Sequence, residues 1–203
     1  LKLEADQNTR RLTNDSSSRS TGFGVTIFAN GIGVDASASR SQANSRTDER
    51  TQVATVVNAG GHATLASGSD TNFVGAQVRA DKIEAEVGGD LTIHSLPDTS
   101  STRGKSSSSG VGMGFGVGGP SLNISVGRGQ VKADYASVQQ QAGLFARSGG
   151  FDVQVQGKTE LVGGAIVGAE GAKNQLSTGT LTARDVHNQS HASASSSSLD
   201  GFS

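Results

Sequence analysis

The chain has 203 residues, with 33% hydrophobic residues, 4% aromatic residues and 29 glycines, and its formal net charge is −1 at pH 7. So few large apolar side chains cannot fill a wide globular core, whereas a narrow core extended along an axis needs fewer of them. A charge close to zero without a basic block argues against nucleic acid as a partner, and the absence of cysteine excludes a disulfide framework and thiolate metal sites.

The first predicted element is a β-hairpin over about residues 16–40. From Phe23 to Ala38, apolar residues alternate with small or polar ones on both sides of Asn30-Gly31. Asn-Gly between alternating runs is typical of a type I′ turn, in which both central residues have a positive φ angle. Serine-rich segments flank this stretch, and we expect them to act as tethers.

Short runs of β-branched and aliphatic residues follow over about residues 51–97, separated by glycine corners such as 60–61 and 88–89. Recurrent short strands with polar corners are typical of a parallel β-helix, in which each strand pairs with the equivalent strand of the next coil. The fold class predicted is therefore all-β. The inward-facing core residues predicted for both repeats are Val78, Ile83, Val87, Leu91, Ile93, Val153, Val155, Leu161, Val167 and Leu181.

The same order of elements then recurs. The serines at 16–18 and Gly22-Phe23-Gly24 return at 106–109 and Gly114-Phe115-Gly116, and again from Ser195 to Phe202, with offsets between 87 and 92 residues. A fixed period is the signature of a repeat architecture. We predict a first repeat over 1–105, a second over 106–194 (hairpin about 110–127, coils about 137–187) and the start of a third at 195–203. We expect the chain to be a slice of a longer protein.

These blocks resemble the repeats of the filamentous haemagglutinin family, which are large exoproteins of two-partner secretion. More narrowly, they resemble the haemagglutinin repeat region of contact-dependent growth inhibition effectors. The resemblance rests on the serine-rich segments, the Gly-Phe-Gly stretches and blocks such as 75–78, 87–91 and 176–181. It implies a right-handed parallel β-helical shaft, a secreted or bacterial cell-surface location with a possible periplasmic stage, and a role in adhesion or toxin delivery.

The resemblance also implies the partners. These would be an outer-membrane secretion partner protein, the surface or outer membrane of a target cell, and the remainder of the exoprotein at both ends. It supplies no catalytic residues, because the toxic activity of the family resides in a variable C-terminal domain outside these repeats. We therefore expect no catalytic residue, no cofactor and no metal ion in this chain.

The candidate functional residues are the apolar positions of the two hairpins, which would face a membrane or a partner. They are Phe23, Val25, Ile27, Val111, Met113, Phe115, Val117, Leu122, Ile124 and Val126. Strands of roughly 9–11 alternating residues are long enough to cross a bilayer. The alternative is that each hairpin folds back on the coils and buries this face. For an isolated chain the alternative is favoured, because few aromatic residues are available to line a membrane interface.

Two other functions are open. One is an adhesin that binds ligands on host or neighbouring cells. The other is a β-helical polysaccharide-active enzyme, for which Glu84 and Glu86 would supply paired carboxylates on one outward face. With one tyrosine and no tryptophan to stack on sugar rings, a carbohydrate cleft is not expected.

The four histidines do not indicate a metal site or a catalytic site. His187 and His191 lie four residues apart in a polar segment, which favours two solvated side chains over a metal site. His62 and His94 are single residues in or beside strands, without a visible partner in the sequence.

Overall fold

The structure, a computed structural model, describes residues 1–202. Every regular element in this part of the chain is a β-strand, which confirms the all-β prediction. Residues 1–202 contain no helix that is long and apolar enough to span a membrane.

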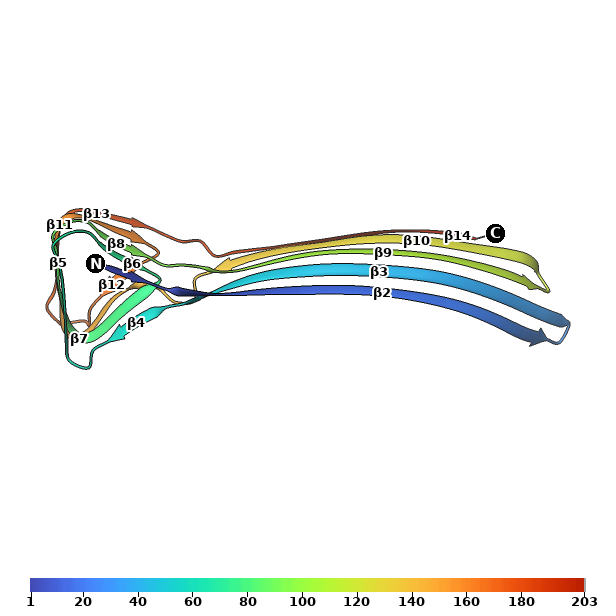
Figure 1. The fold of residues 1–203 in the computed structure, drawn as a ribbon, viewed down its shortest axis with the longest axis horizontal. Coiled ribbons are helices and arrows are strands. Elements are labelled where there is room, and N and C mark those ends of the chain that lie inside the picture. Colours follow the sequence, from blue (N-terminus) through green and yellow to red (C-terminus); the bar gives the residue numbers. More distant parts are fainter. Residues whose placement is uncertain (203) are drawn as a thin grey trace. The chain divides into compact units, whose positions relative to one another are not determined.

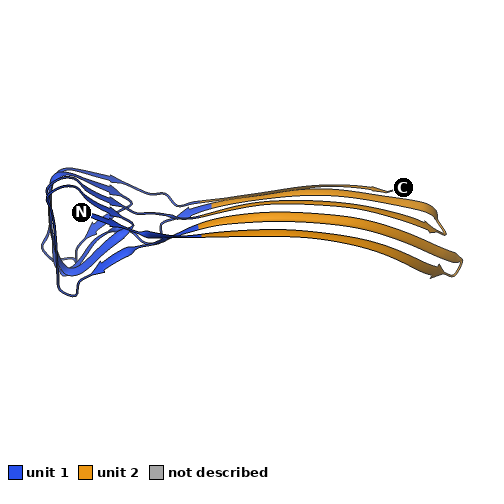
Figure 2. Ribbon diagram, viewed as in Figure 1, with its two compact units in different colours: residues 1–9, 50–99, 135–189 blue, residues 10–49, 100–134, 190–203 orange. Residues whose placement is uncertain are grey.

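The chain divides into two compact units, shown in different colours in Figure 2. The coil unit comprises residues 1–9, 50–99 and 135–189, and the hairpin unit comprises residues 10–49, 100–134 and the segment from Ser190 onward. In chain order the strands are β1 (Lys2–Glu4), β2 (Asp6–Phe28), β3 (Gly31–Val53), β4 (Thr55–Asn58), β5 (His62–Ser67), β6 (Thr71–Val74), β7 (Ala76–Val87), β8 (Leu91–His94), β9 (Asp98–Gly116), β10 (Gly119–Ser137), β11 (Gly143–Val162), β12 (Ala165–Val167), β13 (Asn174–Arg184) and β14 (Gln189–Phe202).

The coil unit is a parallel β-helix, as predicted. Its nine strands form one sheet in which the pairs β4·β7, β5·β7, β6·β8, β7·β11 and β11·β13 are all parallel. Ala63 lies opposite Ile83 and Phe73 lies opposite Ile93, so the first complete coils are 20 residues long. Each coil buries its apolar edge on the next, which a narrow core of small aliphatic residues can achieve.

The core of the coil unit agrees with most of the predicted inward positions. Ile83, Leu91, Ile93 and the other predicted positions through Val155 are buried, and Leu161 packs against this core while partly exposed. Two predicted core residues are wrong, because Val167 is 46% exposed and Leu181 is 53% exposed. Both lie on β12 or β13, which pair with β11 alone among the described strands, so no further coil covers them.

The hairpin unit is a five-stranded sheet with the order β14-β10-β9-β3-β2, and the arrows in Figure 1 alternate in direction across it. Residues 29–30 join β2 to β3, and residues 117–118 join β9 to β10. The predicted type I′ turn at Asn30-Gly31 is wrong, because within residues 1–202 no residue other than glycine has a positive φ. The turn lies one residue earlier, and Gly31 already begins β3.

The places where the chain leaves the β-helix explain the repeat period. Hairpins follow β1 and β8, and β14 follows β13. These three strands belong to one stacked column, because Glu4 lies opposite Val74, Val74 opposite His94, His94 opposite Val162 and Val162 opposite Arg184. Equivalent positions at 4, 94 and 184 are 90 residues apart, so one period consists of two coils and one hairpin.

Candidate functional site

The hairpin sheet has two chemically different faces. Strand residues alternate between the faces, and contacts between neighbouring strands fix which residues share one. A Cβ atom on Gly22 would lie 2.9 Å from the Ser37 hydroxyl, and one on Gly114 would lie 2.8 Å from the Ser121 hydroxyl. These glycine and serine positions therefore form one face, which we call the glycine face. The residues between them form the other, the apolar face.

All the candidate residues from the two hairpins lie on the apolar face. Their exposed fractions run from 38% for Leu122 to 81% for Ile27. Ile32 and Val34 of β3 share this face and are 65% and 40% exposed. The predicted candidate residues did not include Ile32 and Val34, although apolar residues alternate with small or polar ones along β3 as they do along the other hairpin strands. Within the hairpin sheet itself these side chains are exposed, and a role of this face in contacting a membrane or a partner stays a prediction.

The apolar residues lie side by side on neighbouring strands and form one continuous surface, which we call the apolar field. A Cβ on Gly112 would lie 3.8 Å from the Asn123 Cβ, which makes these two direct partners and places Met113 beside Leu122 on the opposite face. From Val111 to Val117 the field extends about 20 Å along β9, at roughly 3.3 Å per residue. No described residue of the hairpin unit forms a second layer over this field, and its side chains face solvent.

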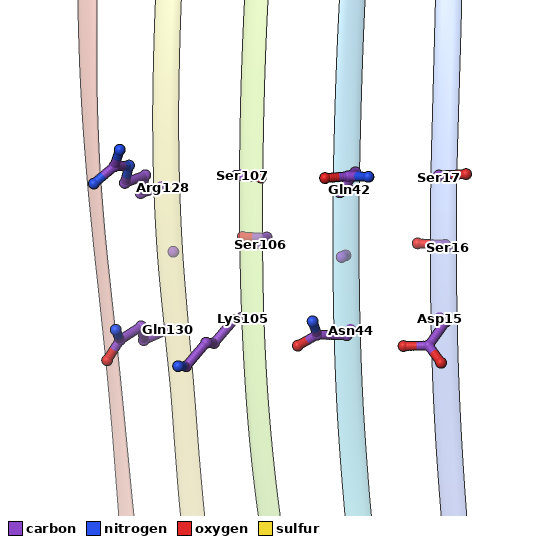
Figure 3. A pocket seen from close by; sticks show the side chains of 12 residues that line it. Asp15, Ser16, Ser17, Gln42, Asn44, Lys105, Ser106, Ser107, Arg128 and Gln130 are labelled. Atoms are coloured by element: carbon purple, nitrogen blue, oxygen red, sulfur yellow. The ribbon is translucent and has the colours of Figure 1, made fainter.

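Beyond the apolar field, the same face becomes polar and basic. Figure 3 shows Arg128 and Gln130 of β10, Lys105 of β9 and Asn44 of β3 on neighbouring strands, beside Asp15 of β2. Together they line a shallow open trough of about 500 Å³. The trough is too open to enclose a small molecule, so its chemistry is that of a surface with exposed charges.

Further along the face, carboxylates pair with arginines. Asp48 accepts hydrogen bonds from the Arg46 and Arg11 Nε atoms at 2.8 and 2.6 Å, and these lower its pKa. Asp134 lies 2.9 Å from the Arg103 guanidinium, whose hydrogen bond is the main cause of a lowered pKa at this carboxyl. These contacts pair three arginines with two carboxylates, so most of the positive charge in this region of the face is compensated.

The residues weighed for other chemistry give no competing site. The prediction that His62 has no partner is wrong, because its Nε2 lies 3.1 Å from the Glu84 carboxylate. Lys82 also pairs with Glu84, and this hydrogen bond is the main cause of a lowered pKa at Glu84. Glu86 is exposed, as are His187 and His191. Within residues 1–202, no three His, Asp or Glu side chains gather where they could hold a metal ion.

The chain matches one family model and is similar over most of its length to several known proteins. Residues 1–109 match the family model of the hemagglutinin repeat. The chain is 38% identical over 93% of its length to a deoxyribonuclease CdiA of Yersinia pseudotuberculosis, and 40% identical over 100% to a tRNA nuclease CdiA of Yersinia mollaretii. A toxin CdiA of Escherichia coli is 35% identical over 95% of the chain.

The chain spans only 18%, 7% and 6% of the lengths of these three relatives. No solved structure matches it. The family model, by contrast, covers more than half of the chain and includes the first hairpin, the first two coils and the start of the second hairpin. The chain therefore belongs to the hemagglutinin repeat family.

Proposed function

We propose that this chain is a structural and delivery repeat segment of a large secreted bacterial surface exoprotein, which supports contact-dependent delivery of a toxin across the outer membrane of a target cell. In this proposal the coils supply the shaft, and the apolar face of the hairpin sheet engages the target-cell membrane. The observation that carries the proposal is the exposed apolar field, on a chain similar along its length to proteins named toxins.

The energetics support an apolar environment for this face. Burying a large aliphatic or aromatic side chain contributes about 1.5–3 kcal/mol relative to leaving it in water. Summed over the field, with Phe23 at 76% and Phe115 at 67% exposure, complete transfer from water would contribute on the order of 10 kcal/mol. An exposed patch of this kind typically marks an interaction surface.

The proposal assigns no catalysis to this segment. The nuclease activities named for the relatives belong to whole proteins, of which this chain is a small part. The Glu84 carboxylate is engaged by Lys82 and His62, which speaks against the polysaccharide-active alternative. We propose that an outer-membrane secretion partner exports the exoprotein, that a periplasmic stage precedes delivery, and that the repeats continue at both ends.

A competition co-culture tests the proposal. The complete exoprotein carries Phe23→Asp and Phe115→Asp in this segment, and growth of target cells is counted beside inhibitor cells. The matched control is Phe28→Asp, because Phe28 lies on the glycine face, over Gly33. We expect the double variant to reach the inhibitor surface but fail to inhibit, whereas the control inhibits normally. Full inhibition by the double variant, with equal surface display, would refute the role of the apolar face.

A further inference from the structure

Unpaired cations gather on the apolar face where the apolar field ends. Ser18 and Ser41 hydrogen-bond at 2.8 Å across β2 and β3, so the neighbouring Arg19 and Arg40 lie side by side on the opposite face, which is the apolar face. The next positions away from the hairpin tips include Arg128 and then Lys105, seen on adjacent strands in Figure 3. We call these four residues the cationic rows.

The cationic rows have little compensating charge. All four side chains are exposed, and within residues 1–202 none of them makes an ion pair, in contrast to Arg11, Arg46 and Arg103 further along the same face. Asp15 is the carboxylate that shares this stretch of the face. Four cations and one carboxylate therefore give the stretch next to the apolar field a net positive charge, although the whole chain carries a net charge of −1.

We infer that the cationic rows bind anionic phosphate-bearing headgroups of a lipid membrane while the apolar field contacts its acyl chains. The inference rests on the proposed function and names the lipid chemistry that the same face recognises. The spacing supports it, because the field is about 20 Å deep at roughly 3.3 Å per residue and the cations begin immediately beyond it. Arginine suits this role, since its guanidinium can hold a phosphate through two hydrogen bonds.

The apolar field favours a lipid surface over a soluble polyanion. A nucleic acid or an acidic polysaccharide would pair with the cations but leave Phe115, Met113 and their neighbours in water. An anionic membrane satisfies both parts of the face at once, because exposed cations are attracted to its surface while apolar side chains enter below the headgroups.

Vesicle flotation of the 203-residue chain tests the inference, with phosphatidylcholine alone or in an equal mixture with phosphatidylglycerol. The test variant replaces three cations of the rows, Arg19→Gln, Arg40→Gln and Arg128→Gln. The matched control removes three exposed cations of the coil unit that make no ion pair within the described residues, Arg50→Gln, Arg147→Gln and Lys173→Gln. A third variant, Phe23→Ser with Phe115→Ser, weakens the apolar field. Far-UV circular dichroism verifies that each protein is folded.

We expect the wild-type chain to prefer the anionic vesicles, and the test variant to lose roughly 100-fold in partition to them while binding phosphatidylcholine as before. The control variant keeps the wild-type preference for anionic vesicles, and added salt removes this preference.

Equal partition of the wild type to both vesicles, or an unchanged preference in the test variant, would overturn the inference and leave the proposed function intact. Undiminished flotation of the Phe23→Ser, Phe115→Ser variant would instead count against the proposed role of the apolar field. Heparin binding that requires the rows, without a vesicle preference, would assign them to a soluble polyanion and overturn the lipid assignment.

Discussion

Replacing Ser95 with alanine should destabilise the coil unit, because this side chain joins coils on the two sides of an inserted hairpin. Ser95 is fully buried, and its hydroxyl donates to the Gly163 carbonyl at 2.7 Å and accepts from the Ala142 N–H at 2.8 Å. Gly163 keeps a second donor, the Gln141 side-chain amide at 3.1 Å, but the Ala142 N–H is left without a described partner. A lost hydrogen bond costs about 1 kcal/mol and an unsatisfied buried donor about 1–3 kcal/mol, so the free energy of unfolding should fall by about 2–4 kcal/mol.

Urea unfolding followed by far-UV circular dichroism measures this loss, and a thermal melt should show a Tm lower by about 5–10 °C. Thr71→Val is the matched comparison, because the Thr71 hydroxyl is buried without a hydrogen-bond partner in the structure. Removing that hydroxyl at constant shape should leave stability unchanged or raise it by about 1 kcal/mol. If Ser95→Ala costs less than about 0.5 kcal/mol, or no more than Thr71→Val does, the reasoning from buried hydrogen bonds is refuted.

Three other changes follow from the described contacts. Asp90→Ala removes the carboxylate that accepts the Lys158 N–H at 3.0 Å at a coil corner, and should lower the free energy of unfolding in urea by about 1 kcal/mol; no change would count against it. Gly150→Ala should destabilise more than Asp90→Ala, because Gly150 has a φ of 71° and a Cβ would collide with the neighbouring coil. Arg103→Gln should raise the pKa of Asp134 toward its ordinary value of 3.8, which carboxyl-carbon NMR measures. Because the pKa of Asp134 is lowered in the folded state, its pairing with Arg103 favours folding above the unfolded-state pKa. This contribution is lost as pH falls through the folded-state pKa. An unchanged titration midpoint of Asp134 in the Arg103→Gln variant would contradict the prediction.

Local sequence patterns predicted the strands, the two hairpins and most of the buried core residues. Alternation marked both hairpins and the coil strands, and the β-branched and aliphatic residues placed Ile83, Leu91 and Val153 in the core. Alternation also separates the apolar face from the glycine face, since every strand changes face with a period of two. The repeats gave offsets between 87 and 92 residues, but the structure was needed to fix the period at 90 residues and to explain it as two coils and a hairpin.

Features that depend on distant strands could not be predicted in this way. Leu181 has the same local pattern as Leu91, yet it is exposed because β13 has a partner on one side only. His62 meets Glu84 through the pairing of β5 with β7, and local sequence patterns do not show which strands pair. The cationic rows combine Arg19 and Arg40 of one hairpin with Arg128 and Lys105 of the next, so their charge is visible only once β3 and β9 are known to be neighbours.

In the proposed function, the apolar face of the hairpin sheet and not the glycine face enters lipid. The chain contains no cysteine, so Leu122→Cys and Asn123→Cys each introduce a single site for an environment-sensitive fluorophore. These adjacent exposed residues of β10 lie on the apolar and the glycine face respectively. On addition of anionic vesicles, the label at position 122 should shift to the blue and be quenched by nitroxide-labelled lipid tails, while the label at position 123 remains in water. Equal responses at both positions, or a response at position 123 alone, would contradict the claim.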